Sequence, residues 1–253
     1  MNVEDALKPG SRTFHVRGFG VAAVVAVGVA VLAQAGDTAL TWAIVVATDR
    51  ARRSGDLSAV FRLDDLLRSA GSLVALAEAA ALAATIVWLW RARRNLDAFP
   101  GREPGLGAGW AIGGWFLPIA NAVIPARVMT DVARLSCPGR RVGAVAVFWW
   151  LALLTSRLVG VSVGNAAGER ITLVFDAAPG TLVDIYRQFA VGNTVALLAA
   201  LVAAAAFAVV VTRVSVAQEE RIHRGWYEAR NRVMGVTPPA GEPDGAGGGT
   251  IRA

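Results

Sequence analysis

Four long apolar runs, separated by short arginine-rich stretches, dominate the hydrophobic pattern of this chain. We place them at residues 18–36, 70–90, 142–163 and 189–212. A helix of about 20 residues, rising about 1.5 Å per residue, crosses a hydrocarbon core of about 30 Å. The pattern therefore predicts an all-α, polytopic helical membrane protein with four transmembrane helices, within a transmembrane domain at 18–213.

The first run follows a short basic tail, residues 1–17. A basic tail before an apolar run is typical of an uncleaved signal anchor. It is also typical of a cleaved secretory signal, and residues 33–35 (AQA) have the small-x-small form of a cleavage site. The residues alone leave both interpretations open. Apolar residues continue to Ala47, so the helix either runs on past Asp37 or bends there.

Two other segments carry apolar residues on one side of a helix and charged residues elsewhere. They are 49–69, with a stripe from Leu57 to Leu67, and 214–234, with a stripe from Ile222 to Val233. We expect both to be interfacial amphipathic helices, although the same stripe would serve for packing against protein. The segment 235–253 is rich in proline and glycine, and we expect it to be a disordered tail.

The segment 109–126 is apolar but broken by Pro118, Asn121 and Pro125. Each proline removes an amide donor, and an asparagine in lipid needs a partner. We therefore expect a re-entrant hairpin and not a fifth span. A hairpin also places both termini on the same side as the arginines around 91–94 and 213–232, which the positive-inside rule makes cytoplasmic. In this topology the arginine-rich loop between the first and second spans lies on the outer side, against the positive-inside rule.

Composition agrees with a membrane protein. Hydrophobic residues make up 55% of 253 and charged residues only 17%, with a mean hydropathy of +0.50. The net charge of +6 comes from arginines that flank apolar runs, so we expect no nucleic-acid partner. The expected partners are the lipid bilayer, anionic lipid headgroups at the cytoplasmic face, and a protein partner or a second copy of the chain. The expected location is the bacterial plasma membrane.

Polar side chains inside apolar spans are costly and therefore indicate a site. Glu78 in the second span and Arg157 in the third lie at depths that match within about one helical turn, so we expect them to form an ion pair. We place Asp37 and Asn193 in the same intramembrane polar pocket. The alternatives are a purely structural ion pair, or an Arg157 that extends to lipid phosphate. A row of small residues, Gly160, Gly164 and Gly168, is suited to a helix-packing face or a dimer face, and of the two we expect packing inside the molecule.

The run RARRN after a tryptophan-rich span, followed by GWAIGGWFLPIANAVIP, resembles the bacterial membrane proteins grouped as domain of unknown function 4328. The resemblance covers about residues 70 to 215. That family has no assigned activity, so the resemblance implies a multi-span helical fold and no chemistry. The residues that carry it form a candidate broken-helix motif: Arg94, Asn95, Trp110, Trp115, Phe116, Pro118, Asn121 and Pro125.

The broken-helix motif has two interpretations. Broken helices can expose carbonyls toward a cavity, with Asn121 as a polar ligand, or the tryptophans can simply anchor the hairpin. The sequence has no HExxH motif and no helix with paired carboxylates at metal-ligand spacing. We therefore expect no enzyme, no catalytic residues, no cofactor and no metal.

The predicted function is that of a non-enzymatic scaffold or regulatory partner. The first alternative is a small transporter or channel with a polar pocket. The second is a lipid-modifying membrane enzyme that uses Glu78 or Asp131 with Arg94. A transporter needs a hydrated path to Glu78 or Asn121, whereas a scaffold should have these residues packed and satisfied.

Overall fold

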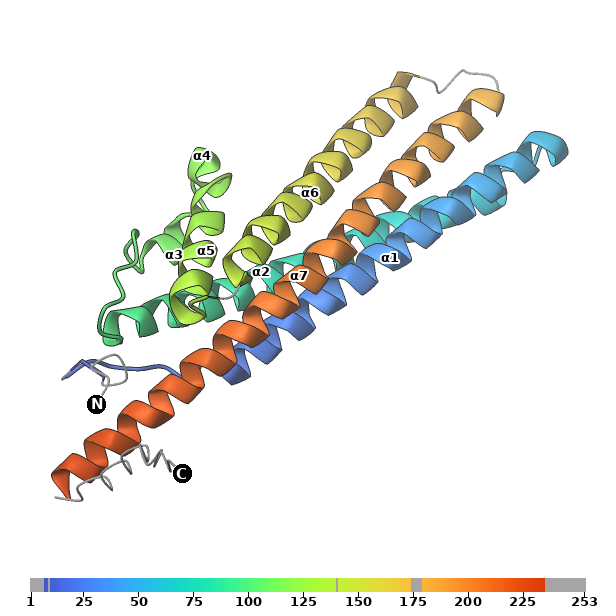
Figure 1. The fold of residues 1–253 in the computed structure, drawn as a ribbon. Helices are drawn as coiled ribbons and strands as arrows, with labels where there is room; N and C mark the ends of the chain where they lie inside the picture. Colours follow the sequence, from blue (N-terminus) through green and yellow to red (C-terminus); the bar gives the residue numbers. More distant parts are fainter. Residues whose placement is uncertain (1–6, 9, 140, 174–178, 235–253) are drawn as a thin grey trace, which may run out of the picture.

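The computed structural model describes residues 7–8, 10–139, 141–173 and 179–234, and these residues form helices, turns and loops without a strand. Four of the helices, α1, α2, α6 and α7, are long and apolar enough to cross a membrane. The prediction of an all-α polytopic membrane fold is thereby confirmed. The helices, shown in Figure 1, are α1 (Arg17–Ser54), α2 (Ser58–Ala98), α3 (Trp110–Gly113), α4 (Pro118–Asn121), α5 (Ile124–Ser136), α6 (Val142–Leu173) and α7 (Pro179–Val233).

The long helices pack as two antiparallel pairs, α1 with α2 and α6 with α7, and the pairs meet where α7 packs against α1 (Figure 1). We call the end where α1 begins and α2 ends the termini end, and the opposite end the far end. At the far end Gly55 has a φ of 76°, a left-handed conformation that suits glycine, and its amide donates to Ala51 O. Asp56 then accepts a hydrogen bond from the amide of Ser58, the first residue of α2, 2.8 Å away.

The helices extend well past the apolar runs. α1 continues through Asp37 as one helix to Ser54. The expectation of a separate interfacial helix at 49–69 was wrong, because this segment forms the end of α1 and the beginning of α2. Part of its stripe packs on protein: Val60 is buried against Ile44 of α1, and Tyr186 of α7 covers the same cluster. Leu57 and Phe61 of the same stripe are exposed. An amphipathic stripe indicates only that one face of the helix is buried, and either lipid or protein can bury that face.

α7 has 55 residues and is about 80 Å long at a rise of about 1.5 Å per residue. The segment 214–234 was expected to be a helix of its own, but residues up to 233 continue the last span without a break (Figure 1). Ile222 is buried, and Leu7 of the N-terminal tail packs against Gly225. The expected disordered tail at 235–253 lies outside the described residues.

The chain between α2 and α6 follows a hairpin path. It leaves α2 at the termini end, passes through α3 and α4, and returns along α5 to the end where α6 begins (Figure 1). α5 packs against α2, α6 and α7. The tip is apolar and exposed, with Ile119 at 89% and Phe116 at 69% of their accessible area, which is suitable for contact with lipid. The segment 109–126 therefore does not add a fifth long helix to the bundle.

The core lies toward the termini end, where α1, α2, α3, α5, α6 and α7 all contribute buried residues. Trp88 of α2, Trp149 of α6 and Phe207 of α7 form its aromatic centre, and the Trp149 and Phe207 ring centroids are 5.7 Å apart. The expected internal packing of Gly160 and Gly164 is wrong, because both open onto free space. The close approach of α6 and α7 occurs at Gly192, against the Val163 side chain.

Candidate functional site

α2 and α6 do not pack against each other directly within the described residues, and a cavity of about 630 Å³ lies between them. α1 and α7 supply its other walls, and the α3–α4 region covers one side. The walls are mainly alanine, valine and leucine, and the alanine-rich stretches of α2 and α7 leave this space because their side chains are small. A cavity of this size falls within the range of about 300–1,000 Å³ typical of small-molecule sites.

A single ion pair bridges the gap between the two helices. Arg157 Nη1 donates to Glu78 Oε2 at 2.6 Å, which confirms the pairing expected from their matching depths. Both side chains line the cavity and are partly exposed, Glu78 at 28% and Arg157 at 53%. They are the two ionisable side chains among its lining residues in the part of the chain that the structure describes. The polar end of the cavity is therefore net neutral.

Aromatic side chains close the cavity toward the termini end. Trp115 stacks edge-on against Trp150 with centroids 5.8 Å apart, and Trp150 Nε1 donates to Ala122 O at 2.9 Å. Trp150 precedes Arg157 by seven residues, or about 10 Å along α6. Trp115 Nε1 is buried and has no hydrogen-bond partner within the described region. This geometry is that of a pocket with an aromatic floor.

The broken-helix motif contributes three residues to the cavity: Trp115, Pro118 and Asn121. The Asn121 side-chain amide makes no hydrogen bond within the described part of the chain, so it is available to a ligand. Pro118 and Pro125 stand in the first turns of α4 and α5, where a missing amide proton costs nothing. Trp110 begins α3 and does not line the cavity.

Asp37 and Asn193 do not line this cavity. Asn193 Nδ2 lies 3.4 Å from Thr41 Oγ1, and that hydroxyl donates to the Asp37 carbonyl. These residues belong to the contact between α1 and α7. Of the four residues expected in one pocket, the structure therefore brings Glu78 and Arg157 together. Asp37 and Asn193 lie at the interface between α1 and α7.

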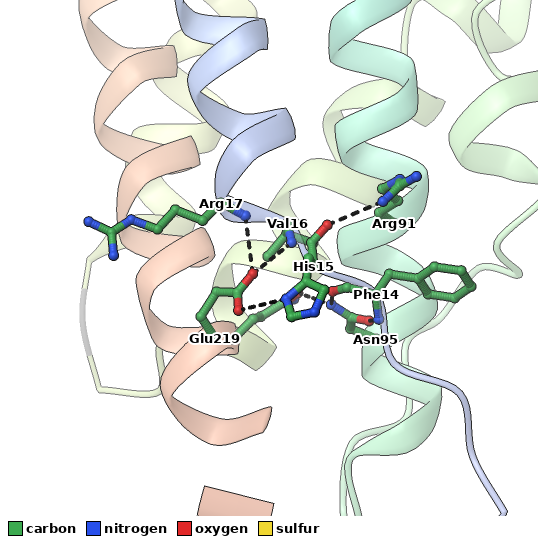
Figure 2. A network of polar contacts seen from close by, with 8 residues as sticks. Phe14, His15, Val16, Arg17, Arg91, Asn95 and Glu219 are labelled. Carbon is green, nitrogen blue, oxygen red and sulfur yellow. Dashed lines mark hydrogen bonds and ion pairs between the residues drawn. The ribbon is translucent and has the colours of Figure 1, made fainter. Parts of the chain in front are cut away.

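Arg94 and Asn95 lie far from the cavity lining, at the termini end, and they differ in role. Arg94 is half exposed, with its nearest carboxylate, Asp97, at 3.9 Å. Asn95 is fully buried and clamps the backbone of Phe14: its Oδ1 accepts from the Phe14 amide at 2.7 Å, and its Nδ2 donates to the Phe14 carbonyl at 2.9 Å (Figure 2). Nδ2 also donates to Gln218 Oε1 at 3.0 Å.

Glu219 completes this cluster by capping α1 from a distant part of the chain. Its Oε1 accepts from the amides of Val16 and Arg17 at 2.9 and 3.3 Å, and His15 Nδ1 lies 3.3 Å from its Oε2 (Figure 2). Free amides at a helix start favour a carboxylate. The polar groups of this cluster satisfy one another, which indicates a structural role and not a ligand site.

Sequence reasoning missed several of these residues. Gln218 Nε2 donates to Ala92 O and to Ser136 Oγ, and the buried Arg93 holds the loop before α3 through Leu106 O at 2.7 Å. Arg93 resembles its exposed neighbours in the RARRN run, so only the three-dimensional contact separates it from them. Within the described residues there is no group of three His, Cys, Asp or Glu side chains that could hold a metal ion.

The sequence profile of one family, described as Domain of unknown function (DUF4328), matches residues 51–215. The match runs from the end of α1 into α7 and includes both members of the ion pair and the whole broken-helix motif. No curated protein matches the chain. No solved structure matches it either.

Proposed function

The chain belongs to the family of domain of unknown function 4328, and we propose that it is a non-enzymatic membrane protein that takes an amphiphilic molecule into the cavity between α2 and α6. The proposal corresponds most closely to the small-transporter alternative. One observation carries it: the Glu78–Arg157 pair lines an apolar cavity of about 630 Å³ instead of being enclosed by packed side chains. A purely structural ion pair gains nothing from such a space.

The walls and the opening support an amphiphile over a small hydrophilic solute. Most lining residues are apolar, which suits a hydrocarbon chain, and the two charged side chains, Glu78 and Arg157, pair across the gap between α2 and α6. These helices do not pack directly, and the paired side chains of Glu78 and Arg157 are partly exposed, so we infer that the cavity opens between α2 and α6 toward the surrounding lipid. The aromatic floor favours a binding pocket over a continuous pore.

For the membrane setting, we propose the bacterial plasma membrane with both termini cytoplasmic. The support is the positive-inside rule applied to the fold, since basic side chains gather at the termini end. The arginines there include the 91–94 group at the end of α2, those of α5, and those in the last turns of α7: Arg91, Arg93, Arg94, Arg127, Arg134, Arg213, Arg221, Arg224 and Arg230.

A second candidate function, that of a scaffold or regulatory partner, is supported by the end of α7. This helix continues past the start of α1 (Figure 1) and exposes Trp226 and Tyr227 among its arginines. An exposed aromatic and basic helix is suited to a protein partner or to anionic headgroups. The two candidates use different surfaces, so they can be tested separately.

The test of the cavity is a matched pair of tryptophan substitutions on one helix. Ala204 lines the cavity, whereas the next residue, Ala205, is exposed and lies outside the lining. The full-length protein is placed in lipid nanodiscs together with a single-chain lipid whose hydrocarbon tail carries a photoactivatable group. After illumination, labelled peptides are mapped by mass spectrometry. We expect labelling of cavity residues in the wild type and in Ala205→Trp, and its loss in Ala204→Trp. Equal cavity labelling in both variants would overturn the proposal.

A further inference from the structure

We propose that the cavity selects an amphiphile with a zwitterionic headgroup, whose cationic group binds Glu78 and whose anionic group binds Arg157. This inference rests on the proposed function and names the class of its ligand. The observation that carries it is one acid and one base, paired across the gap between α2 and α6 in a mainly apolar cavity.

Net charge is the first argument. Within the described lining the charges of Glu78 and Arg157 cancel, so an empty cavity is neutral. An anionic or cationic headgroup would bring a net charge into a cavity with mainly apolar walls, and such a charge is costly without a counter-ion. A zwitterion brings no net charge, and each of its two groups meets a charge of opposite sign.

Unused hydrogen-bonding capacity is the second argument. Arg157 uses Nη1 for Glu78, and its remaining N–H donors have no partner among the described residues. Glu78 engages Oε2 only, so Oε1 is free to accept from an ammonium group. A guanidinium has five donors and a carboxylate can accept about four hydrogen bonds, so a headgroup can bind both without breaking their contact.

The neutral polar residues of the cavity suit the rest of such a molecule. The side-chain amides of Gln34 on α1 and Asn121 on α4 line it and are both without a hydrogen bond in the region that the structure describes. Amide donors at these positions can bind phosphate or ester oxygens next to the headgroup. The apolar walls then accommodate the hydrocarbon chain.

The headgroup preference can be reversed by removing one charge at a time. In the same nanodisc assay, three photoactivatable single-chain lipids are compared that differ only in headgroup: phosphoethanolamine, phosphoglycerol, and a quaternary ammonium without phosphate. We expect wild-type protein to label with the phosphoethanolamine lipid about tenfold more than with either of the others, the equivalent of one charge-assisted hydrogen bond. Glu78→Gln should shift the preference to the anionic lipid, and Arg157→Gln to the cationic one.

The double variant Glu78→Gln/Arg157→Gln keeps the cavity neutral and leaves no charge unpaired, so it guards against single variants that fail to fold. We expect it to label in the cavity without headgroup preference.

Cavity labelling that has the same headgroup preference in the wild type and the double variant would overturn the inference while leaving the proposed function intact. Absence of any labelling sensitive to Ala204→Trp would overturn the proposed function itself. Soluble phosphoethanolamine should not displace the probe, and displacement would overturn the assignment to a lipid.

Discussion

Asn95 is the residue whose loss should weaken the fold most clearly at the termini end. In Asn95→Ala, three hydrogen bonds disappear together: two to the backbone of Phe14 and one to Gln218 Oε1. The alanine side chain can replace none of them. The N-terminal tail then loses its clamp on α2, although Lys8 N still donates to Ala98 O.

The size of the effect follows from these contacts. A hydrogen bond within a protein contributes about 0.5–1.5 kcal/mol net, and a buried partner left unsatisfied costs about 1–3 kcal/mol. Gln218 is buried, so its oxygen cannot recover the bond from water, whereas Phe14 is only partly buried and recovers some. We expect Asn95→Ala to lower the free energy of unfolding by about 2–4 kcal/mol.

The assay is unfolding of the purified chain in mixed micelles with increasing sodium dodecyl sulfate, followed by circular dichroism. The control is Arg94→Ala, one residue away, where the half-exposed side chain lies 3.9 Å from its nearest carboxylate and should contribute less than about 1 kcal/mol. Trypsin should also cut after Arg12 faster in Asn95→Ala. If Asn95→Ala unfolds at the same detergent fraction as Arg94→Ala, the clamp does not stabilise the protein.

Three further predictions follow from the packing, the far-end turn and the topology. Gly192→Ala should destabilise the α6–α7 contact by about 1–3 kcal/mol because its Cβ would collide with Val163, whereas Gly164→Ala opens onto free space and should be neutral or stabilising in the same detergent titration. The hydrogen bond from the Ser58 amide lowers the pKa of Asp56 below its ordinary value. This hydrogen bond should therefore be intact above the unfolded-state pKa of about 4 and be lost as pH falls through the lower folded-state pKa. Amide exchange in the first turn of α2, corrected for the intrinsic rate, should rise over that pH range in the wild type and not in Asp56→Asn. In a Cys137→Ala background, a cysteine at 56 should react with a membrane-impermeant thiol reagent in intact cells and one at 227 only after the cells are opened. The reverse pattern would contradict cytoplasmic termini.

Hydropathy alone was enough to predict the four long helices, because the need to span a bilayer constrains length and composition strongly. The Glu78–Arg157 pair was also predictable, since the fixed rise of a helix converts sequence position into depth. Depth does not specify which way a side chain points around the helix axis. Asp37 and Asn193 are at a suitable depth, yet they lie at the α1–α7 interface.

Two other features could not be predicted because they depend on partners far away in the sequence. The stripe at 57–67 could have packed on lipid or on protein. The turn at Gly55 folds α2 against α1, which buries Val60 and leaves Leu57 and Phe61 exposed. The polar cluster around Asn95 joins residues more than 80 positions apart. A buried glutamine or glutamate near the end of a basic helix looks like any surface residue until its neighbours are known.

The cap on α1 also bears on how the protein is made. Val16 and Glu219 are 203 residues apart, so α1 leaves the ribosome with amides whose carboxylate partner is synthesised 203 residues later. Throughout synthesis those amides must be satisfied by water or by the insertion machinery. The N-terminal tail is then fixed in place only after this part of α7 has been made. A chain truncated before residue 219 should retain its hydrophobic helices but lack the hydrogen bonds from the Val16 and Arg17 amides to Glu219.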